Sequence, residues 1–343
     1  MKLAKGFLTV LLAAKVLLAG AIVGVRVLAE ETALEGVFAA AVKRAGPSVV
    51  SITVEWNPGK KFVPPAPGRP GFERGTGPVA GVIISPDGLI VTSDFNVNAD
   101  AKRVMVKLGD SREFEAKLLG RDVSRGLQLL QIDAKGLPVP PFAEDSRIRV
   151  GRWALVCGVG ETPADPSLSV GIVSATDRLQ GRAIQIDAST NPSNYGGPLV
   201  DIEGRVMGIV TPLTPAGTGG GVMLSDSGVG FAVPVSDVLE HLAKLKAGET
   251  IRSAFLGIRF DTRTMSGGAK VVEVLKDTGA AAAGIRPGDL IVEFNGEPIQ
   301  TSFKLLHAIG RCRVDDVVKF TVVRDGKRIE RTATMGARPE STP

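Results

Sequence analysis

Short apolar segments separated by turn residues occupy most of the chain between residues 81 and 233. Residues 81–85 and 89–92 flank a Pro-Asp-Gly turn, and the same alternation continues through 103–132 and 153–233. The chain contains 42 glycines and 22 prolines, which favour such reversals of direction. Because no helix-length pattern separates the strands, we expect antiparallel barrels rather than a parallel sheet. Residues 47–234 are therefore predicted to form an all-β pair of barrels.

Other segments surround or interrupt the predicted barrels. Apolar residues at helical spacing predict an N-terminal helix at 30–46 and a linker helix within 235–253. Residues 57–79 are rich in Pro, Gly, Lys and Arg, which predicts a solvated loop or arm. Residues 254–336 mix strands with a helix and form a separate α+β unit. Residues 337–343 are expected to be a disordered tail.

The first 29 residues have the features of an export signal. Lys2 and Lys5 precede an apolar segment, residues 7–25, that Lys15 interrupts, and small residues follow at 27–29. Removal by a signal peptidase and retention as a membrane anchor both fit this pattern, with removal favoured. The segment holds four of the 41 basic residues and no acid, so 37 basic and 36 acidic residues remain. A nearly neutral body gives no support for nucleic-acid binding.

The few cysteines and histidines exclude several kinds of site. Cys157 and Cys312 lie far apart in the sequence, and Cys157 alternates with apolar residues as a buried strand thiol would. The two histidines, His241 and His307, are also widely separated, and His241 falls in the predicted linker helix. Neither a disulfide framework nor a metal site is predicted, and no cofactor is expected.

A polar turn at residues 187–197 leads directly into an apolar strand at 198–200. A tight loop between barrel strands is one way to hold a nucleophile beside backbone N–H groups that bind an oxyanion. The segment reads Asp-Ala-Ser-Thr-Asn-Pro-Ser-Asn-Tyr-Gly-Gly-Pro-Leu-Val. It resembles the nucleophile segment of HtrA/DegP-type proteases, Asn-Pro-Gly-Asn-Ser-Gly-Gly-Pro-Leu-Val. Tyr195 occupies the place of the serine, and Ser193 that of the first glycine.

The resemblance to this family covers roughly residues 33–336. Further matching motifs are found at 81–92, 120–122, 170–175 and 229–235. The resemblance implies a trypsin-like double β-barrel over 47–234 followed by a PDZ domain over 254–336. It also implies assembly as a trimer through the barrel domain, either of identical chains or with an active relative.

All three positions of the family's catalytic triad carry other residues. By the motif spacing, the histidine position holds Phe95, the aspartate position Gly126 and the serine position Tyr195. A serine attacks a carbonyl only when an imidazole takes its proton and a carboxylate orients that imidazole. Phe95 accepts no proton, Gly126 orients nothing, and Ser193 alters the oxyanion loop. We therefore predict no catalytic residues and a pseudoprotease.

Two alternatives remain open at this stage. One is an active serine endopeptidase of protein quality control with non-standard residues, for which Ser193 is the conceivable nucleophile and Asp94 or Asp187 the base. Cys157 as a nucleophile lacks a basic neighbour in the sequence. The other alternative is a purely structural partner subunit.

The C-terminal unit suggests what the chain binds. PDZ domains add a ligand strand to a sheet edge and receive a terminal carboxylate on backbone N–H groups. By resemblance, that loop is Phe255, Leu256, Gly257 and Ile258, and the facing helix near 302–309 contributes Phe303, Leu306 and His307. The expected partners are peptides, protein C-termini or unfolded segments. The expected location is the periplasm or another extracytoplasmic space, with membrane attachment through residues 7–25 if the anchor is retained.

Overall fold

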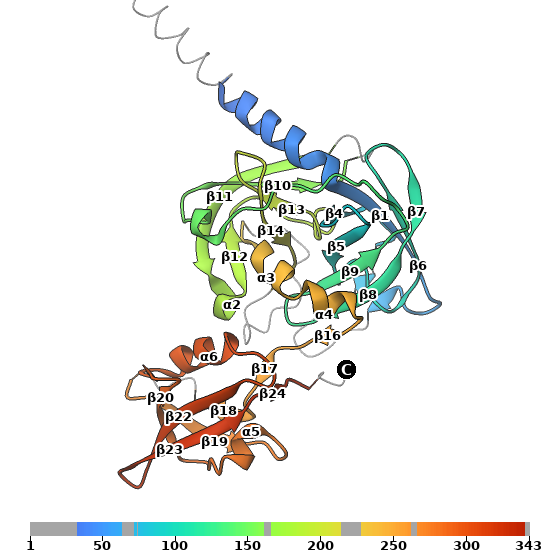
Figure 1. The fold of residues 1–343 in the computed structure, drawn as a ribbon. Coiled ribbons are helices and arrows are strands. Elements are labelled where there is room, and N and C mark those ends of the chain that lie inside the picture. Colours follow the sequence, from blue (N-terminus) through green and yellow to red (C-terminus); the bar gives the residue numbers. More distant parts are fainter. Residues whose placement is uncertain are drawn as a thin grey trace, which may run out of the picture.

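Two β-barrels and a smaller sheet domain follow one another along the chain (Figure 1). The computed structural model describes residues 33–63, 72–73, 75–160, 166–213, 228–261 and 266–339. The predicted signal or anchor at 1–29 lies outside these ranges. Within them, no helix is both long enough and apolar enough to cross a membrane. A helix over residues 33–45 leads into the barrels, and its Phe38 packs edge-on against Trp153.

The first barrel is an eight-stranded sheet in the order β16-β8-β9-β5-β4-β1-β6-β7. Seven of the eight strands come from the chain before the second barrel. Six of these seven contain buried residues, as the short apolar segments of the sequence predict. The eighth strand, β16 (Thr250–Ile251), comes from the linker and pairs parallel with β8. The other strands are β1 (Val49–Trp56), β4 (Val79–Ile83), β5 (Leu89–Ser93), β6 (Ala101–Lys107), β7 (Glu113–Glu115), β8 (Lys117–Asp122) and β9 (Leu127–Gln131).

The second barrel is closed, in the order β10-β11-β12-β15-β14-β13. All its neighbouring pairs are antiparallel, as expected for strands joined by tight turns. The strands are β10 (Trp153–Gly158), β11 (Ser167–Asp177), β12 (Ala183–Ile186), β13 (Pro198–Val200), β14 (Val206–Val210) and β15 (Gly230–Pro234). Between β11 and β12 lies a short turn, α2 (Arg178–Gly181), in which Leu179 and Gln180 have left-handed backbone angles.

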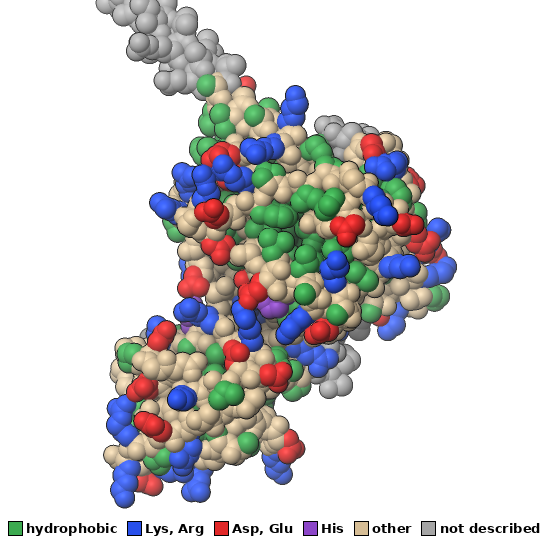
Figure 2. Space-filling view, viewed as in Figure 1, with side chains coloured by type: hydrophobic (Ala, Val, Ile, Leu, Met, Phe, Trp, Pro, Cys, Tyr) green, Lys and Arg blue, Asp and Glu red, His purple; other side chains and the backbone are tan. Residues whose placement is uncertain are grey.

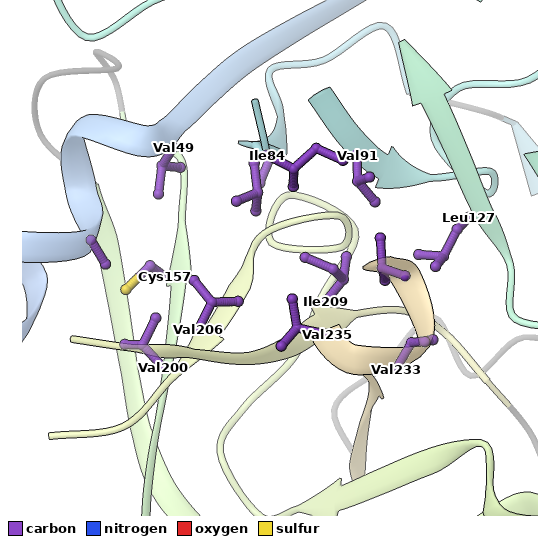
Figure 3. Close-up of a cluster of buried hydrophobic side chains, with 14 of the residues drawn as sticks. Val49, Ile84, Val91, Leu127, Cys157, Val200, Val206, Ile209, Val233 and Val235 are labelled. Atoms are coloured by element: carbon purple, nitrogen blue, oxygen red, sulfur yellow. The ribbon is translucent and has the colours of Figure 1, made fainter. Parts of the chain in front are cut away.

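One hydrophobic core is shared by the two barrels (Figure 3). Val91 and Leu127 of the first barrel pack in the same cluster as Val206, Ile209 and Val233 of the second. Complete burial of such a side chain stabilises the folded state by about 1.5–3 kcal/mol. The shared core therefore fixes how the barrels face each other, and with it the position of the loops between them.

The linker differs from the single helix that the sequence predicts. It forms two short helices, α3 (Val235–Glu240) and α4 (Leu242–Lys246), separated at His241. The imidazole Nδ1 of His241 lies 2.8 Å from the carbonyl oxygen of Asp237, so this side chain forms a contact within the linker. Val238 and Leu245 are buried in the shared core, which ties the linker to the barrels rather than leaving it as a spacer.

Two boundaries predicted from the sequence also need correction. Residues 57–79 contain a short hairpin of β2 (Phe62–Val63) and β3 (Phe72–Glu73) rather than loop alone. Gly336–Ala337 form strand β24, which pairs with β17 (Ala254–Phe255), so the ordered chain continues past residue 336. In both places backbone hydrogen bonds to a partner strand outweigh a weak local β preference.

The C-terminal domain contains a sheet in the order β18-β19-β20-β22-β23, with β21 paired to β20. Its core includes Leu256, Ile291, Phe294, Leu305 and Phe320. The strands are β18 (Ile258–Phe260), β19 (Ala269–Val274), β20 (Leu290–Phe294), β21 (Glu297–Pro298), β22 (Val317–Arg324) and β23 (Lys327–Thr334), and the helices are α5 (Gly279–Ala282) and α6 (Ser302–Gly310).

A buried ion pair holds one end of this domain together. The Asp289 side chain is 1% exposed and accepts hydrogen bonds from Arg324 Nε at 2.7 Å and Nη2 at 2.8 Å. The backbone N–H of Arg286 donates a third bond at 2.9 Å. Burial raises the pKa of the Asp289 carboxyl, but the bonds from Arg324 and Arg286 outweigh it and hold the pKa below its ordinary value.

We expect Asp289→Asn to lower the free energy of unfolding of the C-terminal domain by about 3 kcal/mol, because it leaves Arg324 without its anion. A carboxyl whose pKa is lowered by folding contributes stability above its unfolded pKa and loses it as the pH falls through the folded value. Urea unfolding at a series of pH values from 7 to 2 measures this effect. The free energy of unfolding of the wild type should fall below about pH 4, and that of the variant should fall less.

Glu293→Gln is the matched control, because its partner Arg328 is 64% exposed. This change should alter stability by less than about 1 kcal/mol. Equal effects of the two substitutions would contradict the role assigned to the buried pair.

Candidate functional site

The turn at residues 187–197 lies between the two barrels and is bonded to both. The N–H of Ala80 donates to the carbonyl of Ser193 at 3.1 Å, and the Asn96 side-chain amide donates to the carbonyls of Pro192 and Tyr195. Gly196 has φ +90°, and a Cβ there would lie 2.3 Å from Thr92 Oγ1. Glycine is therefore required where the turn crosses the first barrel.

Phe95 and Tyr195 meet in this cleft. Their ring centroids are 5.7 Å apart and the planes are perpendicular, an edge-to-face contact that aromatic rings prefer. Tyr195 is 3% exposed and belongs to the core of the second barrel, against which Phe95 also packs. The two positions that the sequence assigned to the base and the nucleophile are thus brought together, as two hydrophobic rings.

The backbone N–H groups of the loop already have acceptors. By resemblance, an oxyanion would be held by the N–H groups of the nucleophile position and of the residue two before it. Here the N–H of Tyr195 donates to the Asn191 carbonyl at 3.2 Å, and the N–H of Ser193 donates to Asn191 Oδ1 at 2.9 Å. The loop folds back on Asn191, so these donors are directed at the protein itself.

The Ser193 hydroxyl bonds within the same turn. Its Oγ donates to Asn191 Oδ1 at 2.6 Å, and an amide oxygen is not a base that could remove the proton at neutral pH. Of the two acids considered as a base, Asp187 accepts the N–H of Ile172 at 2.6 Å. Asp94 lies beside Gly126 and lines the cavity described next.

A cavity of about 310 Å³ lies beside Gly126. Asp94, Phe95, Gly126, Arg182 and Thr211 are among its lining residues. A Cβ on Gly126 would point at Asp94 Oδ1, 3.3 Å away. Thr211 is 1% exposed, and its hydroxyl has no hydrogen-bond partner within the part of the chain that the structure describes. A buried hydroxyl without a partner costs about 1–3 kcal/mol, and sequence reasoning missed this residue.

The cysteines are unsuited to nucleophilic chemistry. Cys157 is buried and free, which confirms the buried strand thiol predicted from the sequence. Burial raises the pKa of its thiol to about 12. The pKa of Cys312 is raised to about 11, mainly by burial. Reactive cysteines require a lowered pKa, so neither is a thiolate at neutral pH.

The segment Phe255–Ile258 forms a loop of defined shape. Gly257 has φ +87°, and a Cβ there would lie 2.1 Å from Thr278 Oγ1. The carbonyls of Leu256 and Gly257 accept from the N–H groups of Ala280 and Leu275, both at 2.9 Å. A trans peptide places its N–H opposite its C=O, so the N–H groups of Gly257 and Ile258 point away from these contacts. The loop leads into β18, which stands at the end of the sheet order.

The three residues assigned to the facing helix lie in different surroundings. Phe303 on α6 is 62% exposed. His307 Nε2 lies 3.1 Å from Asp177 Oδ2 of the second barrel, and Leu306 lines a cavity between the barrels and the C-terminal domain. The sequence places all three on the groove wall, and in the structure His307 and Leu306 are also next to the barrel side of the domain. No local sequence pattern signals that contact.

Two family models match the chain, in agreement with the fold. A trypsin-like peptidase domain matches residues 79–209, and a PDZ domain matches residues 254–334. Among solved structures, the HtrA-type protease AlgW with a decapeptide has a TM-score of 0.70 at 29% identity, covering 88% of this chain and 99% of that one. The serine endoprotease from Yersinia pestis has a TM-score of 0.66 at 29% identity, covering 88% and 98%.

Curated relatives are probable periplasmic serine endoproteases of DegP-like type. The protein from Ectopseudomonas mendocina is 33% identical and covers 88% of this chain, which spans 71% of its length. The protein from Pseudomonas savastanoi pv. phaseolicola is 35% identical and covers 81% of this chain, which spans 60% of its length. The fold is that of a trypsin-like β-barrel domain followed by a PDZ domain. The chain therefore belongs to the HtrA/DegP family of trypsin-like serine proteases with a C-terminal PDZ domain.

Proposed function

We propose that this chain is an exported pseudoprotease that binds polypeptide without cutting it. The observation that carries the proposal is the contact between Phe95 and Tyr195, at 5.7 Å between ring centroids, at the positions of the base and the nucleophile. Neither ring can take a proton from a hydroxyl and return it to a leaving amine. With Gly126 at the third position, the triad has no member that performs its reaction step.

The oxyanion loop supports the same proposal. Stabilising a tetrahedral intermediate requires donors aimed at the place where its negative charge develops. The N–H groups of Ser193 and Tyr195 instead donate to Asn191, and the Tyr195 ring is buried against Phe95. A substrate carbonyl would have to displace both, which would break bonds that the loop makes with itself.

Peptide binding is proposed for the PDZ domain. The N–H groups of Gly257 and Ile258, directed away from the bonds to Ala280 and Leu275, are the proposed donors to a terminal carboxylate, and β18 is the proposed strand edge for pairing. Phe303, exposed on α6, is the proposed side-chain contact of the groove. AlgW, a relative of similar fold, has been solved with a decapeptide, and we extend peptide binding to this chain by analogy.

We further propose a periplasmic location and assembly as a homotrimer or as a mixed trimer with an active relative. The basic and apolar pattern of the first 29 residues, and the probable periplasmic location of the relatives, support export. A retained segment 7–25 would attach the assembly to the membrane. In a mixed trimer, the chain would bring peptides to a catalytic partner.

The central test is cleavage of an unfolded protein by purified residues 30–343. We expect no cleavage, with the substrate retained by the protein in a pull-down assay. A Ser193→Ala variant separates a rearranged active site from a contaminating protease. Cleavage that Ser193→Ala abolishes would overturn the pseudoprotease and favour an active endopeptidase, whereas absence of both cleavage and retention would favour a structural subunit.

Reverting only Tyr195→Ser should leave proteolysis undetectable. The new hydroxyl would face Phe95, which is not a base, and loss of the base alone typically removes several orders of magnitude in rate. Release of fluorescent fragments from labelled casein measures the effect. The variant must keep the far-UV circular dichroism of the wild type, because the removed ring leaves a cavity in the second barrel. Turnover in this single variant would refute the argument from the missing triad.

Gly257→Val should weaken peptide binding at least about tenfold, equivalent to about 1.4 kcal/mol. A β-branched side chain at φ +87° would be strained and would overlap Thr278, so the loop must change shape. Fluorescence anisotropy with peptides that the wild type selects from a C-terminal library gives the dissociation constants. Gly296→Val is the matched control, since Gly296 also has a positive φ but nothing within 4 Å of its Cβ. An unchanged dissociation constant for Gly257→Val would refute the placement of the loop.

A further inference from the structure

A cavity of about 410 Å³ lies where the second barrel, the linker and the PDZ domain meet. The barrels contribute Arg125 and Arg182, the linker contributes Lys244, and the PDZ domain contributes Arg311 and Arg338. Figure 2 shows lysine and arginine side chains, mixed with acidic side chains and a histidine, at this narrow junction. Arg182 also lines the cavity beside Gly126, and Arg338 lies against the Phe255 ring, so the junction cavity adjoins both the cleft and the loop Phe255–Ile258.

The lining of this junction cavity has an excess of positive charge. Seven lysine and arginine residues line it, against four aspartate and glutamate residues, which is an excess of three charges. Arg125 is neutralised by Asp122 and Asp237, and Arg313 by Glu240. Arg182, Arg311 and Arg338 form no ion pair with a carboxylate in the described part of the chain.

Arg182 is the most informative of these three residues. Its guanidinium group donates to the carbonyls of Leu179 and Ser124, to the Ser253 hydroxyl and to the Gln180 amide oxygen, all of which are neutral. These bonds hold the side chain between barrel and linker, and the nearby carboxylate of Asp122, which is itself paired with Arg125, attracts the guanidinium group without bonding it. Burial lowers the pKa of Arg182, and the nearby charges of Arg125 and Arg338 lower it further.

Arg338 approaches the cavity from the end of the PDZ domain. Its N–H bonds to the carbonyl of Ser253 at 2.9 Å, and its guanidinium carbon lies 5.6 Å from the centroid of the Phe255 ring. The backbone bond fixes this residue against the linker, on the segment where Arg182 also bonds. The two guanidinium groups lie near enough for the charge of Arg338 to lower the pKa of Arg182.

We propose that the junction cavity binds a small multivalent oxyanion of the phosphate class, and that the bound anion holds the PDZ domain against the barrel. Arginine is the side chain best suited to phosphate oxygens, because its fixed fork of donors forms paired bonds with them. The cations come from three parts of the fold. They therefore fit an anion whose oxygens point in several directions better than they fit a planar carboxylate. Binding removes the repulsion between Arg182 and Arg338 and stabilises the docked arrangement.

The test uses isothermal titration calorimetry of residues 30–343 with inorganic pyrophosphate and inorganic phosphate at constant ionic strength. We expect pyrophosphate to bind with one site per chain and to raise the midpoint of thermal unfolding. The double variant Arg311→Gln, Arg338→Gln should weaken binding about a hundredfold, at about tenfold for each lost charge-assisted contact. Both positions lie at the surface, so the fold should persist. Absence of binding by the wild type would overturn the proposal.

Arg331→Gln is the matched control, because Arg331 is a half-buried arginine of the same domain outside the cavity. An equal loss of affinity in this control would mean that the anion binds through general charge, which would also overturn the proposal. A second experiment measures binding of the protein to vesicles of phosphatidylglycerol, with and without pyrophosphate. Competition between vesicles and pyrophosphate would identify a lipid headgroup as the source of the phosphate, whereas binding of pyrophosphate without vesicle binding would identify a free anion.

Small-angle X-ray scattering tests the proposed effect on the docked arrangement. Pyrophosphate should decrease the radius of gyration of the wild type and leave that of the double variant unchanged. An anion that binds without any change in the scattering profile or in the unfolding midpoint would contradict the role in docking. Peptide binding at the PDZ groove is measured separately, so failure of this proposal is distinguishable from failure of the proposed function.

Discussion

The shared hydrophobic core between the barrels is the interaction on which the rest of the structure depends. Val91 and Leu127 on one side, with Val206 and Ile209 on the other, hold two independently paired sheets in one orientation. That orientation brings the segment after β5 to the turn at 187–197, although 100 residues separate Phe95 from Tyr195. The linker helices bury Val238 and Leu245 in the same core and thereby place the PDZ domain.

The cleft between the barrels combines a tightly bonded turn with an apolar contact. Gly196 makes the close approach to Thr92 that the turn requires, and Asn96 bonds the turn from the opposite barrel. The Phe95 and Tyr195 rings pack on the core of the second barrel, where their contact stabilises the fold. The Thr211 hydroxyl beside Gly126 is left without a described partner, a local cost that remains in an otherwise well-packed site.

The junction of barrel, linker and PDZ domain combines attraction and repulsion. His307 with Asp177 and Arg313 with Glu240 draw the domains together, while Arg182 and Arg338 bring like charges to the same cavity. Exposed ion pairs contribute about 1 kcal/mol or less each, so a few charges decide the balance at such a junction. An anion in the cavity would shift that balance.

The sequence by itself determined the two barrels, the separate C-terminal domain and the turn at 187–197. Strand periodicity and turn residues depend on only a few neighbouring residues, so they can be recognised in the sequence. Only the tertiary structure decided that Phe95 meets Tyr195, that Asn191 takes the N–H groups of the turn, and that His307 faces the barrel. The break at His241 and the strand β16 likewise follow from packing on the barrel. Contacts between distant residues depend on how whole elements pack. No short segment of sequence determines the energy of that packing.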